Sequence, residues 1–300
     1  MNYETFKQSI VDSLKKHFGK DVTVSLHTVI KNNDLSLDGL TIEEPSVNIS
    51  PTVYLNYYYE DYRMGKDLSK IVDEIISSYY DHLPNENMDF SFFTDYQQVK
   101  YKIIYKLINY EKNQKLLADV PHFKFLDLAV VFCCFLSDTP HGNATILIHN
   151  HHIDIWHTTA DVLYELAIKN TPILLPYENV SMESVLASMG NAMQITVPDF
   201  PVGLPMMYVL SNKAKLYGAA AILYPDVLAA FAKSQNSDLY IIPSSIHEVL
   251  LFHKNEHTSS LDLNQMINEV NASHVLPEEI LSDHVYCFER ASGFITLNFQ

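Results

Sequence analysis

Two stretches of the sequence hold side chains that could take part in chemistry. The first contains Ser244, Ser245, His247 and Glu248, which supply a hydroxyl nucleophile, a base and a carboxylate side by side. Such groups hydrolyse esters and amides when tertiary structure aligns them, but neighbours on one turn seldom face one another correctly. The GxSxG pattern of a nucleophile elbow is also missing. We therefore interpret the stretch as a turn whose hydroxyls bond the backbone, with Ser245 and His247 kept as the catalytic candidates of a hydrolase.

The second stretch is rich in histidine and follows an apolar run. It contains His149, His151, His152 and His157. If the run is a β-strand, His149 and His151 point to the same side, and this pair could form half of a zinc or iron site. Because the spacing identifies no third ligand, an exposed strand end is the favoured interpretation. A metal-dependent enzyme using His149 and His151 stays open as an alternative, and we predict no bound cofactor.

The cysteines and the charge balance exclude several other classes of protein. Cys133, Cys134 and Cys287 are an odd number without CxxC spacing, which favours reduced thiols and a cytoplasmic location. The chain has 20 basic and 36 acidic residues, for a net charge of −16. Nucleic-acid binding requires a basic face, so this balance argues against it. The longest apolar run, residues 128–136, is too short to span a membrane.

The first ninety residues predict a small helical and β-stranded unit. An amphipathic helix covers residues 1–20, and a second helix follows from the apolar spacing of residues 68–80. Between them, Asp38 and Gly39 predict a two-residue hairpin turn, and residues 52–56 predict an extended segment. A polar stretch near residues 83–95 then marks a boundary, so we expect an N-terminal unit at residues 1–92.

Residues 93–300 predict a larger unit with three hairpins. The expected strand pairs are residues 127–136 with 144–149, residues 238–243 with 247–253, and residues 285–289 with 294–299. Helices are expected at residues 159–170, ended by Pro172, at residues 225–233 and at residues 261–270. Four proline and glycine residues between 197 and 205 predict a mobile connection near residues 190–205. The sequence thus predicts an α+β fold of mainly antiparallel sheets with flanking helices.

Five segments of the chain resemble a known bacterial family. They are KNNDLSLDGLTI, SPTVYLN, KLINYEKNQKLLADVPH, KNTPILLP and SDLYIIPSSIHEVLL. On these segments the chain is similar to the domain of unknown function 5688 (DUF5688), along almost its whole length. Residues 102–253 also resemble, more distantly, the YtpQ-like proteins. The resemblance implies a bacterial, cytoplasmic α+β protein of a kind often carried on mobile elements, and it brings no reaction, substrate or catalytic residue.

We expect the protein to be a binding or regulatory module rather than an enzyme, with a protein or a small molecule as its ligand. Polar and aromatic side chains gather at the predicted junctions between strands and helices, where ligands commonly bind. The residues expected to line such a groove are Asn150, Trp156, Asn212, Tyr224, Ser245 and His247. A third alternative is an anti-defence factor that sequesters a nucleotide signal. Arginine is scarce, but backbone amides at helix starts could bind the phosphates.

Overall fold

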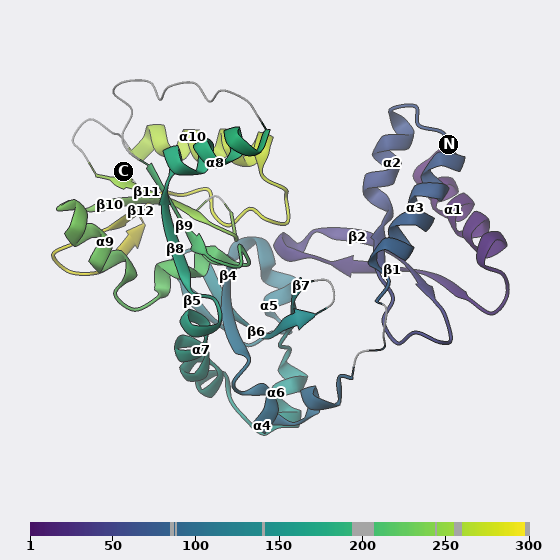
Figure 1. Ribbon diagram of the computed structural model, residues 1–300, viewed down its shortest axis with the longest axis horizontal. Coiled ribbons are helices and arrows are strands. Elements are labelled where there is room, and N and C mark those ends of the chain that lie inside the picture. Colours follow the sequence, from purple (N-terminus) through teal and green to yellow (C-terminus); the bar gives the residue numbers. More distant parts are fainter. Residues whose placement is uncertain are drawn as a thin grey trace. The chain divides into compact units, whose positions relative to one another are not determined.

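A computed structural model describes residues 1–84, 87, 89–139, 142–193, 207–243, 245–254 and 260–297 (Figure 1). The chain forms two compact units, made of residues 1–93 with 137–144, and of residues 94–136 with 145–300. Helices and antiparallel sheets are combined in an α+β fold, as predicted. Most of the connection predicted near residues 190–205 lies outside the described residues. The sequence-based division into folding domains at residue 92 stays a prediction.

The first unit is a three-stranded antiparallel sheet packed against helices. The strands are β1 (Thr23–Ile30), β2 (Ser36–Glu43) and β3 (Thr52–Tyr54), in that order across the sheet. The helices are α1 (Tyr3–Phe18), α2 (Leu55–Arg63) and α3 (Leu68–His82), with a short 3-10 turn η1 (Asn32–Asp34) between β1 and β2. Apolar residues at helical spacing in α1 and α3 meet the buried side chains of the strands, as the amphipathic pattern predicts.

Two sequence predictions for this unit are wrong. The hairpin turn lies at η1, where Asn33 and Asp34 adopt left-handed φ values of 61° and 50°. Gly39 lies inside β2 instead. A glycine is needed there because a Cβ would come within 2.8 Å of Thr52 Cγ2 and 2.9 Å of Val29 Cγ2. The extended segment also ends at Tyr54, and the tyrosines that follow belong to helix α2.

The second unit contains two sheets. The smaller has the order β4 (Ile103–Asn109), β6 (Leu128–Thr139) and β5 (His122–Phe125), and β7 (Gly142–Leu147) also pairs with β6. The short helical segments of this part of the chain are α4 (Tyr96–Val99), η3 (Glu111–Asn113), α5 (Gln114–Leu117) and α6 (Asn150–Trp156), and η2 (Ser91–Thr94) spans the boundary between the two units. The long helix α7 (Ala160–Leu174) packs against β4.

The sequence predicted that Pro172 ends helix α7. The helix instead contains this proline and continues to Leu174. Proline lacks the N–H that would continue the helical ladder, so its presence needs compensating contacts. The neighbouring Thr171 supplies them: its hydroxyl donates to the Ala167 carbonyl at 2.6 Å and accepts the Tyr105 N–H of β4 at 3.1 Å. This bond fixes the last turn of the helix to the sheet.

The larger sheet has six strands, and every neighbouring pair is antiparallel. Its order is β13 (Ile295–Leu297), β12 (Tyr286–Phe288), β10 (Leu239–Ile242), β11 (Val249–His253), β9 (Met207–Asn212) and β8 (Tyr177–Ser181). The hairpins predicted at residues 238–253 and 285–299 correspond to β10 with β11 and to β12 with β13. The remaining elements are α8 (Met182–Met193), η4 (Gly218–Leu223), α9 (Val227–Gln235) and α10 (Ser260–His274).

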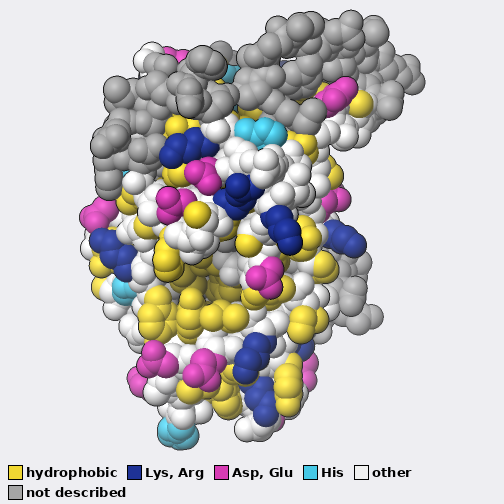
Figure 2. Space-filling view, turned by 90° about the vertical axis from the view of Figure 1, so that its left-hand side faces the viewer, with side chains coloured by type: hydrophobic (Ala, Val, Ile, Leu, Met, Phe, Trp, Pro, Cys, Tyr) yellow, Lys and Arg dark blue, Asp and Glu magenta, His cyan; other side chains and the backbone are white. Residues whose placement is uncertain are grey.

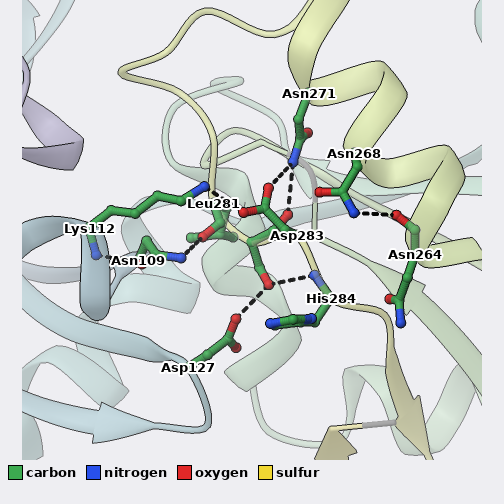
Figure 3. A network of polar contacts seen from close by, with 10 residues as sticks. Asn109, Lys112, Asp127, Asn264, Asn268, Asn271, Leu281, Asp283 and His284 are labelled. Atoms are coloured by element: carbon green, nitrogen blue, oxygen red, sulfur yellow. Dashed lines mark hydrogen bonds and ion pairs between the residues drawn. The ribbon is translucent and has the colours of Figure 1, made fainter. Parts of the chain in front are cut away.

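A buried polar network joins the two sheets of the second unit (Figure 3). Asp127, in the turn between β5 and β6, accepts the Ser282 hydroxyl at 2.6 Å and the Tyr286 hydroxyl of β12 at 2.6 Å. Ser282 and Tyr286 are completely buried. Nearby, Asn109 at the end of β4 donates to the Leu281 carbonyl at 3.0 Å. The segment before β12 is thereby bonded to the edge of the smaller sheet.

We predict that Asp127→Asn lowers the free energy of unfolding by about 2 kcal/mol, because the amide keeps only one acceptor oxygen and leaves one of the two buried hydroxyls without an acceptor. Urea unfolding of the full chain measures the change. Tyr286→Phe and the double variant complete a mutant cycle with it. If the two groups act through their shared bond, the double variant loses less stability than the sum of the single ones. Additive losses would contradict this role of Asp127.

Candidate functional site

The turn between β10 and β11 holds Ser245 and His247 through bonds to the backbone. The Ser245 hydroxyl accepts the His247 N–H at 3.1 Å, and the His247 Nδ1 accepts the Tyr217 N–H at 3.3 Å. The ring proton is therefore assigned to Nε2, which lies 3.7 Å from Glu279 Oε1. A nucleophile and base pair would need the histidine to accept the serine proton, but Nδ1 already accepts the Tyr217 N–H and Nε2 carries the ring proton. Ser244 lies outside the described residues.

Asn212 belongs to the same neighbourhood and fixes the loop after β9. Its buried side chain accepts the Leu216 N–H at 3.2 Å and donates to the Leu216 carbonyl at 2.6 Å. The next residue, Tyr217, stacks on the His247 ring with 5.8 Å between the ring centroids. A Cβ on Gly218 would collide with the Ser211 hydroxyl and the His247 carbonyl. These contacts fill the space around His247 and position η4.

The sequence pattern favoured a strand end for the histidine cluster, but the cluster lies at the start of a helix. Helix α6 begins at Asn150, and His149 stands just before it. The His149 Nδ1 lies 2.7 Å from Asp119 Oδ2, and its backbone N–H donates to the His152 Nδ1 at 2.9 Å. Burial, with the adjacent His151 and His149, lowers the pKa of His152 to about 4. In the described part of the chain, no group of three or more histidine, cysteine, aspartate or glutamate side chains is placed to hold a metal ion.

Asn150 and Trp156, the two predicted binding residues on α6, support that helix. The Asn150 side chain donates to the Ala118 carbonyl at 3.3 Å, and its backbone N–H donates to the Asp119 carbonyl at 2.9 Å. Trp156 is 5% exposed and packs against the His152 ring, with 5.7 Å between centroids. These contacts place the predicted binding residues in two separate groups. Asn212 lies near His247, and Asn150 and Trp156 lie on helix α6.

Tyr224, the sixth predicted residue, lines an apolar pocket of about 460 Å³ beside helix α9. Figure 2 looks onto the side of the molecule that carries α9 and shows hydrophobic side chains gathered around a hollow. We call this hollow the α9 pocket. Its lining is Phe125, Ile222, Leu223, Tyr224, Asp226, Leu228, Ala229, Phe288, Gly293, Phe294 and Ile295.

The α9 pocket has a buried apolar floor and an exposed rim. Ile222, Leu228 and Phe288 are at most 4% exposed, whereas the Phe294 ring at the rim is 70% exposed. Tyr224 forms a fixed wall, because its hydroxyl donates to the Leu175 carbonyl at 2.8 Å and burial raises its pKa. The phenol is therefore neutral and already hydrogen-bonded.

Asp226 is the single charged residue of the lining as far as the structure describes it. It precedes α9 with a left-handed φ of 63°, and its side chain makes no capping hydrogen bond to the helix. Aspartate ordinarily occupies this position in order to cap the helix, in an extended conformation. The exposed carboxylate of Asp226 is thus available to a group that enters the pocket.

The network around Asp127 brings the walls of the α9 pocket together. Phe125 precedes the β5 to β6 turn, in which Leu126 is left-handed with a φ of 56°. Phe288 lies two residues after Tyr286 on β12. Because Asp127 binds the Tyr286 hydroxyl, the two phenylalanines meet at one pocket although they are distant in sequence. Sequence reasoning missed Phe125, Phe288 and Phe294, since no local pattern links their segments.

The first unit has two hollows of a different kind. One, of about 560 Å³, is lined by loop and strand residues that include Asp21, Glu43 and Glu44. The other, of about 620 Å³, lies alongside it and shares Glu44. The Glu44 carboxylate accepts the Tyr79 hydroxyl at 3.0 Å, so it is already used within the unit. Their polar linings offer little apolar surface to a ligand, in contrast with the α9 pocket.

Comparison with known proteins identifies a family without an assigned reaction. Residues 3–290 match a family of unknown function, DUF5688. No curated protein and no solved structure matches the chain. The resemblance to DUF5688 is thereby confirmed, while the likeness to YtpQ-like proteins stays a prediction. Within the described residues, no helix is long and apolar enough to cross a membrane.

We predict that stability falls as the pH drops from 6.5 towards 4, in part because of His152. Over that interval the unfolded chain protonates this ring, whose ordinary pKa is 6.5, but the folded chain does not until about pH 4. His152→Asn keeps an acceptor for the His149 N–H and removes the titration. The stability advantage of the natural chain over this variant should shrink across the interval. A His152 resonance that titrates near pH 6.5 in NMR spectra would show the pKa to be unshifted.

Proposed function

The chain belongs to the DUF5688 family, and we propose that it works as a binding module whose α9 pocket takes up the apolar part of a ligand. The observation that supports this function most directly is the pocket itself, a concave site with an apolar floor and one carboxylate at its rim. Sites of this size, largely apolar with a few polar groups, are typical of ligand binding.

The apolar lining supplies the affinity. Burial of about 100 Å² of ligand surface contributes roughly 2.5 kcal/mol, at about 25 cal/mol for each Å². Phe125, Phe294 and Ile295 are only partly buried, so a ligand would cover apolar surface that water now contacts. Covering this surface favours binding.

The same lining favours binding over turnover. General acid and base chemistry uses two positioned titratable groups, one to give a proton and one to take it. The described lining has Asp226 and the Tyr224 phenol, and the phenol hydroxyl is occupied by the Leu175 carbonyl. A nucleotide phosphate would meet the Asp226 carboxylate and find no lysine or arginine in this lining. We therefore favour an uncharged or positively charged ligand, encountered in the bacterial cytoplasm.

We predict that Ala229→Trp abolishes binding of a neutral apolar dye, N-phenyl-1-naphthylamine, at the α9 pocket. Ala229 is an exposed residue of α9 that lines the pocket, so an indole there would occupy the mouth. The dye becomes fluorescent in an apolar site, and titration should give saturable binding to the natural chain and at least about tenfold weaker binding to the variant.

Ala230→Trp is the matched control. Ala230 is the next exposed residue of the same helix and is not part of the lining, so this variant should bind the dye like the natural chain. Equal loss in both variants would point to damage to the helix, which thermal unfolding detects. Equal, undiminished binding in both, or no saturable binding to the natural chain, would refute the proposed function.

A further inference from the structure

We propose that the ligand of the α9 pocket is an extended stretch of polypeptide, which adds as a new strand beside β13 and inserts one apolar side chain into the pocket. A basic side chain of the same stretch faces Asp226. The inference rests on the proposed function of the pocket and specifies the chemical class of its ligand. It follows from the backbone of β13, which forms both the edge of a sheet and part of the pocket rim.

The backbone groups along the outer side of β13 can be identified from its pairing. Glu289 N–H donates to the Phe294 carbonyl at 3.0 Å, and Gly293 N–H donates to the Glu289 carbonyl at 2.8 Å. Inward and outward groups alternate along an antiparallel strand, and Thr296 is opposite Cys287. Thr296 therefore bonds to β12, whereas the N–H and C=O groups of Ile295 and Leu297 point away from it.

These outward groups have no backbone partner among the described residues. β13 is the terminal strand in the order of its sheet, and its only neighbour there is β12. Proteins commonly block such an edge with a charged side chain or a proline. The sequence Ile-Thr-Leu of β13 contains neither. The edge thus presents donors and acceptors spaced for one further strand.

The pocket lies where the side chains of that further strand would fall. Phe294 and Ile295 belong at once to the exposed edge and to the pocket lining. Side chains of an added strand alternate between the two faces of the sheet, so every second one is directed to the side on which Ile295 and Phe288 stand. One apolar side chain of the peptide can therefore enter the pocket while its backbone pairs with β13.

Charge selects among such peptides. Asp226 is the one charged residue among the described residues of the lining, and its carboxylate does not cap α9. The whole chain has a net charge of −16. A lysine or arginine next to the apolar residue would pair with this carboxylate, whereas an acidic peptide would be repelled. We therefore infer a basic and apolar extended segment of a partner protein, and not a second acidic copy of this chain.

The test is a selection from a displayed library of random heptapeptides with the full chain as target. Enriched peptides should combine one large apolar residue with lysine or arginine. Methylating the backbone nitrogens of alternate residues in an enriched peptide should weaken its binding about tenfold, because two hydrogen bonds are lost while all side chains stay. Methylation of the intervening nitrogens, which face solvent, should have little effect.

Substitutions in β13 separate the strand edge from the pocket. Leu297→Pro removes an outward N–H without breaking a bond to β12, and Leu297 is not part of the lining. This variant should lose about tenfold in peptide affinity and bind N-phenyl-1-naphthylamine normally. Leu297→Ala keeps the N–H and should bind both as the natural chain does, which controls for the lost side chain.

Asp226→Asn tests the charge, since asparagine tolerates the left-handed backbone equally well. The variant should bind the lysine-containing peptide several-fold more weakly and show a smaller dependence on salt. The inference would be overturned if no peptide is selected. It would also be overturned if the selected peptides bind equally well after either methylation and to the Leu297→Pro variant. If the dye still binds the natural chain and not Ala229→Trp, the proposed pocket function stands without it. Failure of the dye as well would remove both.

Discussion

The second unit depends on a single carboxylate shared by two hydroxyl groups. Asp127 stands in a turn of one sheet and accepts hydrogen bonds from the hydroxyls of Ser282 and of Tyr286, which belongs to the other sheet. Hydroxyls as deeply buried as these are costly to leave without an acceptor, so the two sheets are held in one relative position. A second bridge lies beside it: Lys112 pairs with Asp283 at 2.6 Å. Burial raises the Asp283 pKa, but hydrogen bonds from Lys112 and Asn271 outweigh it and keep that pKa low.

The α9 pocket is a result of this constraint rather than of any local motif. Once the turn at Asp127 is fixed to β12, Phe125 and Phe288 face the same space, and η4 with α9 closes it. In the described lining, Gly293 and Ala229 contribute almost no side-chain volume, so this space is not filled completely. An apolar space beside a strand edge that has no second neighbour among the described residues is the feature on which both proposed binding roles depend.

Local patterns in the sequence predicted the elements that form between near neighbours. The apolar spacing of residues 68–80 gave helix α3, and strands separated by short turns gave the hairpins of the larger sheet. The Asp38 to Gly39 turn was wrong because crowding in the sheet, not turn propensity, accounts for the glycine. The pocket could not be predicted, since the Asp127 to Tyr286 bond joins residues 159 positions apart. Of the six residues expected to bind a ligand, the chain brings only Tyr224 to the pocket.

The left-handed backbone at Asp226 has a consequence for the residues that this position can accept without strain. Glycine, asparagine and aspartate occupy that conformation with the least strain, so they are the residues best tolerated at this position. Exchange between aspartate and asparagine alters the electrostatic preference of the rim and leaves the start of α9 in place. If the α9 pocket binds a ligand as proposed, this exchange requires a single nucleotide change and would shift the preference of the rim between cationic and neutral groups.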